Sequence, residues 1–482
     1  MSTRTVPDRA AAGAVGAALR RVGYDEDAII RLLGDDAYEG GLDDVPVHER
    51  RLPKTRLATA VRLFFLELPV SAPDAQRALG RRAVEALPAL GLADVGDEVV
   101  PRARLTPVVD LLLASNRLSY KPESDPPDYV ATYTPTSQLC DLLTPRPQIA
   151  RALDVGTGNG VHALLAARHS RHVVATDVNA RALTFTQLNA ALNNLRNVEC
   201  RRGGLFEPAG DETFDLITCN APFVVSPEHR WAYRDSGSRG DEFSEQVVRG
   251  AAARLAEGGF ATLLVSWVAA DEDAPDEHPF AWVDGSGCDA WILSTHESSP
   301  LDHAAGWNAH LADDREAFGT ALDRWLRYFA ELGVARVTEG AVLLHRRSGS
   351  GNTIRADSID VDALDVADEQ IQRAFAARAQ LAELSRATEL FDARLVPAAT
   401  LELETDLERG GGVARARVRL PEGTQPTVET TARAADVVRL LDGRLTLGDA
   451  VHAVAASDSA LRRDTVALCR ELLELGALAF PR

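Results

Sequence analysis

The sequence predicts an α/β protein with a mostly parallel, seven-stranded sheet between two mainly helical regions. Three observations support this fold class. Apolar segments of strand length alternate with helix-forming segments across residues 121–350. The first of these strands runs into a glycine-rich turn that opens a helix. Residues 1–120 and 351–482 instead show helical spacing of apolar residues, with only a few short strands.

Composition limits the classes of protein that fit. Of the 482 residues, 45% are hydrophobic and 26% are charged, which is ordinary for a chain of several globular domains. Acidic residues number 71 and basic residues 52, so the net charge of −19 disfavours non-specific attraction to nucleic acid or to anionic membranes. No apolar run approaches the roughly 18 residues of a membrane span, so we expect no membrane partner.

The cysteines indicate the compartment. Their number is odd and they lack the CxxC spacing of a metal site, so neither a disulfide framework nor a metal centre is predicted. This usage is typical of a reducing environment, and we expect a cytoplasmic protein that needs no metal. The five cysteines are Cys140, Cys200, Cys219, Cys288 and Cys469.

Residues 1–120 are predicted to form a helical N-terminal domain. Two helices followed by two short strands are expected, at residues 56–68, 74–87, 98–100 and 104–105. This arrangement resembles a winged-helix module. The proline-rich, polar stretch at residues 121–127 marks the domain boundary.

Residues 121–350 hold the strands of the predicted sheet. Each apolar segment is separated from the next by a helix-forming stretch, as in βαβ units. The expected strands are residues 152–155, 172–175, 198–200, 216–219, 260–265, 290–294 and 340–345.

The first strand ends in a glycine-rich turn, Gly156-Thr157-Gly158-Asn159-Gly160. Glycine lets the backbone approach a ligand where a Cβ atom would clash. Asp154 stands two positions before the first glycine, where a carboxylate can organise the turn and meet a ligand ammonium. The spacing is G-x-G-x-G, whereas a dinucleotide site has G-x-G-x-x-G. Asp154 and the five turn residues are therefore predicted to bind S-adenosylmethionine (SAM).

Further cofactor residues are expected at the ends of the next two strands. Asp177 ends the second strand, where a carboxylate can accept hydrogen bonds from both ribose hydroxyls. Val178 and Asn179 follow it at the start of a helix. Gly204 and Leu205 follow the third strand, where a bare backbone and an apolar side chain can flank the adenine.

The fourth strand ends in Asn220-Ala221-Pro222-Phe223. This sequence resembles the (N/D)-P-P-(F/Y) motif of class I SAM-dependent N-methyltransferases. Over roughly residues 129–347 the order of glycine turn, strand-end acid and fourth-strand motif is similar to that of the release-factor glutamine methyltransferase and "methyltransferase small domain" branch. The resemblance implies a Rossmann-like core that binds SAM and methylates a planar nitrogen.

The motif has a physical rationale. The lone pair of a planar NH2 group is delocalised into a carbonyl or a ring, so the nitrogen must be held in line with the methyl group. The Asn220 side-chain oxygen and the Ala221 carbonyl can accept its two N–H bonds, and Phe223 can stack on the acceptor plane. Asn220 also lies beside the expected cofactor. Ala221 replaces the first proline of the pattern, which keeps the carbonyl and loses rigidity.

The same resemblance gives two candidate substrate residues. Thr134 belongs to residues 134–137, which correspond to the segment that closes over SAM in such enzymes. Tyr233 belongs to the glycine-bearing loop after the fourth-strand motif.

Residues 351–482 are predicted to form a C-terminal domain with a β-hairpin. Residues 401–407 alternate apolar with acidic side chains, and residues 414–420 alternate apolar with arginine. Pairing between the acidic row and the arginine row across the two strands explains the arginines better than a nucleic-acid-binding surface does. Three helices and a short strand follow, at residues 434–441, 447–455, 461–475 and 477–480, again in a winged-helix-like order.

The sequence thus predicts a SAM-dependent methyltransferase whose acceptor is a glutamine or asparagine side-chain amide of a protein. An RNA or DNA base amine is the second hypothesis, because the acid excess disfavours nucleic acid, and a small molecule or peptide is the third. A SAM-binding scaffold without turnover would be expected to have a broken turn or to lack Asn220, and neither is the case. We further hypothesise that residues 1–120 select the acceptor and residues 351–482 support the core. Monomer and dimer both remain open.

Overall fold

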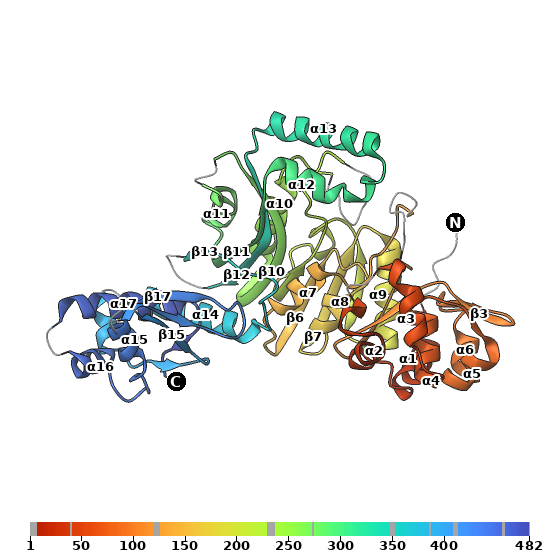
Figure 1. Cartoon of the computed structure of the whole chain (residues 1–482), viewed down its shortest axis with the longest axis horizontal. Coiled ribbons are helices and arrows are strands. Elements are labelled where there is room, and N and C mark those ends of the chain that lie inside the picture. Colours follow the sequence, from red (N-terminus) through yellow and green to blue (C-terminus); the bar gives the residue numbers. More distant parts are fainter. Residues whose placement is uncertain are drawn as a thin grey trace.

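The computed structural model describes residues 7–38, 41–118, 126–228, 237–271, 274–347, 352–384, 387–407, 413–455 and 458–481. Figure 1 shows a central sheet with the N-terminal region at one end and the C-terminal region at the other. We call these two regions the N-terminal flank and the C-terminal flank.

Over the described residues, the central sheet has eight strands in the order β13-β11-β12-β10-β9-β6-β7-β8. Strand β12 is antiparallel to both of its neighbours, and all other pairs are parallel. The strands are β6 (Ile149–Val155), β7 (Ser170–Asp177), β8 (Val198–Arg202), β9 (Phe214–Cys219), β10 (Leu255–Ala269), β11 (Cys288–Ser298), β12 (Arg336–Arg346) and β13 (Ile354–Ser358).

The seven predicted strands are confirmed, and a mostly parallel sheet of this kind is typical of class I methyltransferases. The eighth strand, β13, pairs with β11 and begins after residue 350, so the sheet continues past the predicted end of the core. Three of its five residues, Arg355, Asp357 and Ser358, are charged or polar, and its side chains are mostly half-buried. An edge strand of this composition lacks the apolar run that marks most of the other seven strands.

Helices cover both faces of the sheet. Leu153 and Val155 of β6 belong to the apolar core that includes α10, whereas Ala152 packs with α8 on the opposite face. This alternation is the two-residue period of a strand buried on both sides. The helices of the middle part are α7 (Pro135–Leu142), α8 (Val161–Ala166), α9 (Ala180–Leu192), α10 (Glu242–Arg254), α11 (Glu277–Val283), α12 (Pro300–Trp307) and α13 (Arg315–Leu332).

The N-terminal flank is helical, as predicted, but its helices are shorter than expected. The helix predicted over residues 74–87 is split at Gly80, whose φ of +86° lies outside the helical region. The helix predicted over residues 56–68 turns into a π-helical turn after Ala60. The helices are α1 (Arg9–Arg21), α2 (Glu26–Leu33), α3 (Val45–Arg51), α4 (Arg56–Ala60), α5 (Ala72–Leu79) and α6 (Arg81–Ala86).

Five short strands complete this flank. Strands β1 (Val70–Ser71), β3 (Glu98–Pro101) and β2 (Ala93–Val95) form a small sheet, and β4 (Arg104–Val108) pairs with β5 (Leu111–Ser115) as a hairpin. The hairpin rests on α9, where the Asn189 amide bonds both the N–H and the carbonyl of Ala114, at 2.7 and 2.9 Å. The flank is therefore attached directly to the middle part.

The C-terminal flank begins with α14 (Asp368–Glu383) and contains the predicted hairpin, β15 (Glu402–Leu407) and β16 (Val413–Arg419). The predicted cross-strand rows are confirmed, because Glu402 stands opposite Arg419 and Glu404 opposite Arg417. A third strand, β17 (Thr427–Thr430), and helix α14 were not predicted. The remaining elements are β14 (Val396–Pro397), α15 (Ala432–Val438), α16 (Leu447–Val454), α17 (Ser459–Glu474) and β18 (Leu478–Ala479). The winged-helix interpretation of both flanks stays a prediction.

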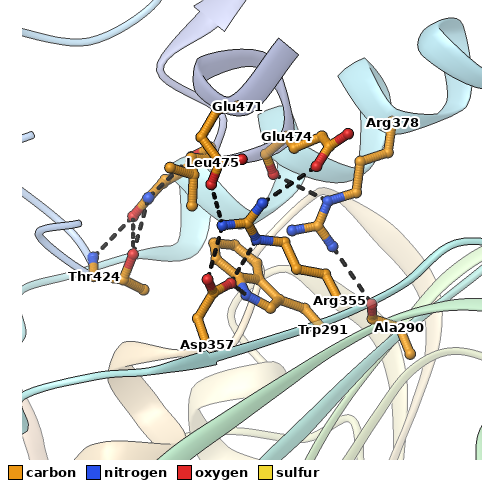
Figure 2. A network of polar contacts seen from close by, with 10 residues as sticks. Ala290, Trp291, Arg355, Asp357, Arg378, Thr424, Glu471, Glu474 and Leu475 are labelled. Atoms are coloured by element: carbon orange, nitrogen blue, oxygen red, sulfur yellow. Dashed lines mark hydrogen bonds and ion pairs between the residues drawn. The ribbon is translucent and has the colours of Figure 1, made fainter. Parts of the chain in front are cut away.

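A partly buried polar network joins α14 and α17 to the sheet (Figure 2). The Arg355 guanidinium of β13 donates to Asp357 at 2.5 and 2.7 Å, and it also bonds Glu471 and Glu474 of α17. Arg378, only 2% exposed, stacks over the Trp291 ring at 4.5 Å. Burial lowers the pKa of its guanidinium to about 10.

Two features are absent from the described residues. None of their helices combines the length and apolar character needed to cross a membrane. The same residues hold no group of three or more His, Cys, Asp or Glu side chains placed to bind a metal ion.

Candidate functional site

The predicted site residues come together at one edge of the sheet. Strand β6 lies between β7 and β9, and Val155 is level with both Thr176 and Cys219. Because the three strands are parallel, the segments that follow them emerge side by side. The glycine turn, Asp177 and Asn220 therefore converge, which is the usual position of a ligand site in an open α/β sheet.

The glycine turn needs its glycines for two reasons. Gly156 and Gly160 have φ angles of +68° and +89°, in the left-handed region. A Cβ atom on Gly156 would lie 2.9 Å from the Ala221 Cβ, and one on Gly160 would lie 2.8 Å from the Thr186 Cγ2. The turn is thus pressed against the fourth-strand motif on one side and α9 on the other. Gly158 differs, because its Cβ would meet only the Gly156 carbonyl at 4.0 Å, which leaves room for a ligand.

Asp154 organises this turn from beneath. Its carboxylate is 1% exposed and accepts hydrogen bonds from the Thr157 hydroxyl at 2.6 Å, the Thr218 hydroxyl at 2.8 Å and the Ala163 N–H at 3.1 Å. Burial raises the pKa of Asp154 to about 6, against the opposing effect of these hydrogen bonds. The contacts account for the turn-organising role expected of Asp154, whereas its contact with a ligand ammonium stays a prediction.

Asp177 has the geometry expected of a ribose-binding carboxylate. One of its oxygens accepts the Gly158 N–H at 3.0 Å and the other accepts the Asn179 N–H at 2.7 Å. Burial raises the pKa of this carboxyl. Each oxygen retains lone-pair capacity for one ribose hydroxyl. The neighbouring Val178 is 57% exposed, and a Cβ on Gly204 would lie 3.8 Å from its Cγ1, so apolar surface is available beside the carboxylate. These residues fit the nucleoside end of SAM.

Two of the predicted cofactor residues, Asn159 and Asn179, use their side chains to hold the segment that precedes α7. The Asn159 Nδ2 donates to the Ala131 carbonyl, and the Asn179 Nδ2 donates to the Asp128 carbonyl, both at 3.1 Å. Each asparagine oxygen also caps the start of the following helix, α8 or α9. Residues 126–134 are thereby tied along the cofactor edge. Asn179 is the N-cap residue of α9, whereas Asn159 precedes Gly160, the N-cap residue of α8.

Asn220 lies against the segment that contains Thr134. The Asn220 Nδ2 donates to the Ser137 Oγ at 3.4 Å, and the Thr134 hydroxyl caps α7 by accepting the Ser137 N–H at 3.2 Å. Ala221 is buried, and Phe223 is half-buried against an apolar cluster that includes Leu264. Pro222 is also half-buried. Tyr233 lies outside the described residues, so its predicted substrate contact stays a prediction.

Helix α13 anchors the chain on both sides of residues 229–236. The Glu228 carboxylate forms an ion pair with Arg324 and accepts the Trp325 indole N–H at 3.2 Å. The Gly240 N–H donates to the Tyr328 hydroxyl at 2.7 Å. This anchor was not predicted from the sequence. Trp325 is buried, as are Trp267, Trp282 and Trp291.

Comparison with known families agrees with this geometry. Residues 135–268 match the family model described as "Methyltransferase small domain", and this stretch contains the glycine turn, Asp177 and the Asn220 motif. Residues 21–104 of the N-terminal flank match a model described only as a domain of unknown function, DUF7059.

Curated relatives match part of the chain. A release factor glutamine methyltransferase of Geobacter sulfurreducens is 35% identical over 133 residues, which are 25% of this chain and 46% of the relative. A ribosomal protein uL3 glutamine methyltransferase of Bradyrhizobium diazoefficiens is 32% identical over 150 residues, 28% of this chain and 47% of the relative. A ribosomal protein L11 methyltransferase of Lactobacillus johnsonii is 39% identical over 88 residues, 18% of this chain and 28% of the relative. The chain spans about half of these relatives or less, and none of the three matches covers more than 28% of the chain.

Proposed function

We propose that this protein is a SAM-dependent N-methyltransferase that acts on a planar amide nitrogen. The observation that carries the proposal is the contact between the glycine turn and the fourth-strand motif. Because a Cβ on Gly156 would collide with the Ala221 Cβ, the backbone of residues 220–221 stands directly beside the predicted cofactor turn. An acceptor held by Asn220 and Ala221 would therefore lie next to the cofactor.

The residues of this chain would supply binding and orientation. SAM, when bound, provides an electrophilic methyl group on a sulfonium. Asp177 would bind the ribose, and Asp154 keeps the turn in shape. The Asn220 Oδ1 and the Ala221 carbonyl would accept the two N–H bonds of the acceptor, which aligns the nitrogen and stabilises the positive charge that develops on it. A strong general base is unnecessary, because the methylated amide nitrogen is acidic once it carries that charge.

A protein glutamine is the acceptor that we propose. Two of the relatives are named as glutamine methyltransferases, one for a release factor and one for ribosomal protein uL3. The net charge of −19 also disfavours a nucleic acid as the acceptor. Methylation of a nucleic-acid base or of a small molecule is the alternative outcome of the test below.

The test is transfer of tritium from labelled SAM into a lysate of cells that lack the gene. We expect a protease-sensitive, nuclease-resistant product, in which mass spectrometry locates one added methyl group on a glutamine. Asn220→Ala should lower turnover by on the order of 10²–10³ while SAM affinity stays near wild type, since one preorganised polar group is removed from the reacting centre. Asn220→Asp should retain more activity than Asn220→Ala, because it keeps an acceptor oxygen of the same shape.

Asp177→Ala is the matched variant on the cofactor side. It should weaken SAM binding by roughly 10–100-fold in calorimetry, since it removes a charge-assisted hydrogen bond. Wild-type turnover in both Asn220 variants would contradict N-methylation through this motif. A nuclease-sensitive product would leave the methyltransferase activity in place and replace the protein acceptor by a nucleic acid.

A further inference from the structure

Asn220 ends a chain of side-chain hydrogen bonds in the first turn of α7. Its Nδ2 lies 3.4 Å from the Ser137 Oγ, which lies 3.0 Å from the Thr134 Oγ1. The Thr134 Oγ1 in turn lies 2.9 Å from the Thr136 Oγ1 and accepts the Ser137 N–H at 3.2 Å. Ser137 is only 7% exposed, so water has little access to its hydroxyl.

Donor and acceptor counts allow the proton arrangement that the hydrogen bond from Asn220 to Ser137 requires. A hydroxyl has one hydrogen to donate and two lone pairs to accept with. If Thr134 donates its hydrogen to Thr136, its lone pairs accept the Ser137 N–H and the Ser137 O–H. Ser137 has then no hydrogen left to donate toward Asn220, so its oxygen can only accept one. In this arrangement the Asn220 amide directs its NH2 group at Ser137, as it does in the structure, and its Oδ1 away from it.

This direction matters because the two ends of an amide differ in chemistry. Oδ1 can accept an N–H of the methyl acceptor, whereas a flipped amide would present NH2 to NH2, donor against donor. A flip would also break the hydrogen bond to Ser137. Distance alone does not distinguish the two orientations, since the amide nitrogen and oxygen are nearly the same size.

We propose that Ser137 is a positioning residue that holds the Asn220 amide with its oxygen toward the methyl acceptor. The inference rests on the proposed N-methyltransferase function, in which Oδ1 accepts an acceptor N–H. Ser137 itself does not touch the reacting atoms. The 3.4 Å separation is expected to shorten when an acceptor draws on Oδ1, since such bonds are often long in the ligand-free state.

A double-mutant comparison tests the role through activity. Ser137→Ala should lower turnover about fivefold to tenfold, with unchanged SAM affinity, because one ordering hydrogen bond is removed. In an Asn220→Asp background the same substitution should have an effect of less than about twofold, because a carboxylate has two acceptor oxygens and cannot be placed the wrong way round. Ser137→Thr, which keeps the hydroxyl, should retain more turnover than Ser137→Ala. Equal losses in both backgrounds would overturn the proposal.

A spectroscopic measurement tests the orientation without an acceptor. In protein labelled with ¹⁵N-asparagine, the Asn220 side-chain NH2 signals are the pair that disappears in Asn220→Asp. Ser137→Ala should shift this pair and speed its exchange with water severalfold, and signals that stay unchanged would overturn the proposal. This readout stands apart from the function itself. If Asn220→Ala turned over like wild type, the N-methyltransferase function would fail while the NMR result still reported the amide orientation.

Discussion

The N-terminal flank meets the sheet domain through one continuous apolar core, whereas the C-terminal flank meets it through a shared helix and a polar network. In the first contact, Val15 and Leu19 of α1 belong to the same buried cluster as Phe185, Leu188 and Leu192 of α9. In the contact with the C-terminal flank, Phe375 of α14 packs against the sheet. Leu381, near the C-terminal end of the same helix, belongs to a separate apolar core within residues 377–478. Figure 1 shows the two flanks on opposite sides of the sheet.

This difference bears on how the flanks can act. Helix α9 begins directly after its N-cap residue Asn179, near Asp177, and its Asn189 donates to the Asn159 carbonyl in the glycine turn at 2.7 Å. The N-terminal flank therefore supports the helix on which the cofactor edge depends. A role for residues 1–120 in acceptor selection stays a prediction, and a deletion cannot isolate it from this support. The C-terminal flank, with its own core, has the contacts of a more separable unit.

We expect deletion of the N-terminal flank to abolish cooperative unfolding, whereas deletion of residues 387–482 should not. Removing residues 1–115 would expose the buried face of α9, at roughly 1.5–3 kcal/mol for each large apolar side chain. A few such side chains approach the whole stability of a domain, about 5–15 kcal/mol. We expect this truncation to lose cooperative unfolding and SAM binding. Removing residues 387–482 should instead lower the thermal midpoint and leave a cooperative transition. The comparison is wrong if the second truncation, and not the first, abolishes the transition in calorimetry.

We expect the buried side-chain amide of Asn189 to contribute much of the stability of the contact between the N-terminal flank and α9. Asn189 is fully buried and bonds the Ala114 N–H, the Ala114 carbonyl and the Asn159 carbonyl. Asn189→Ala leaves these three backbone groups without that partner, and each unsatisfied group costs about 1–3 kcal/mol. We expect a loss of about 4 kcal/mol in urea unfolding, together with weaker SAM binding.

Asn193→Ala is the control for this variant. Asn193 makes the same pair of bonds to Leu112, at 3.0 and 2.8 Å, but it is only half-buried, so water can replace it. Its loss should be smaller and should spare SAM affinity. Equal effects at the two positions would show that the contact with the glycine turn is not what distinguishes Asn189.

The sheet and the site edge could be predicted because they depend on local patterns. Most of the seven predicted strands are apolar runs, and the cofactor residues follow strand ends at fixed offsets. Strand β13 and helix α14 lack such signals. The buried face of α14 includes two polar residues, Gln370 and Arg378. Their partners, such as Thr424 and the Glu474 carbonyl, are distant in sequence.

Within the site, the sequence could give residue types but not partners. Asn159 and Asn179 were expected at the cofactor edge, and their bonds to residues 126–134 depend on where that connecting segment runs. The same holds for Ser137, which is 83 positions from Asn220. Contacts of this kind are set by the packing of α7 against the strand ends, and a single sequence carries no record of that packing.

The polar network of the C-terminal attachment should respond unequally to loss of its two arginines. Arg355→Met removes the cation that Asp357, Glu471 and Glu474 share, and three carboxylates would be left close together. We expect a loss of about 3 kcal/mol. Arg378→Met removes a buried charge whose NH2 atom has no hydrogen-bond partner among the described residues, so it should be near neutral. Chemical denaturation of both variants checks this, and a larger loss for Arg378→Met would reverse our account of Figure 2.

The smallest effect is expected in the hairpin of the C-terminal flank. Arg417 lies 3.1 Å from Asp406 and 3.9 Å from both Glu404 and Glu429, on an exposed surface. Exposed ion pairs contribute about 0–1 kcal/mol, so Arg417→Ala should stay below about 1 kcal/mol. The loss should shrink further at 1 M salt, where the screening length is about 3 Å. Arg417→Lys, which keeps the charge, is the control for side-chain packing.

Because these carboxylates balance the arginine row, we also expect Arg417→Ala to leave the affinity for single-stranded RNA unchanged at about 0.15 M salt. A marked loss of RNA affinity in this variant would mean that the row is a nucleic-acid surface after all, and that the C-terminal flank does more than support the sheet.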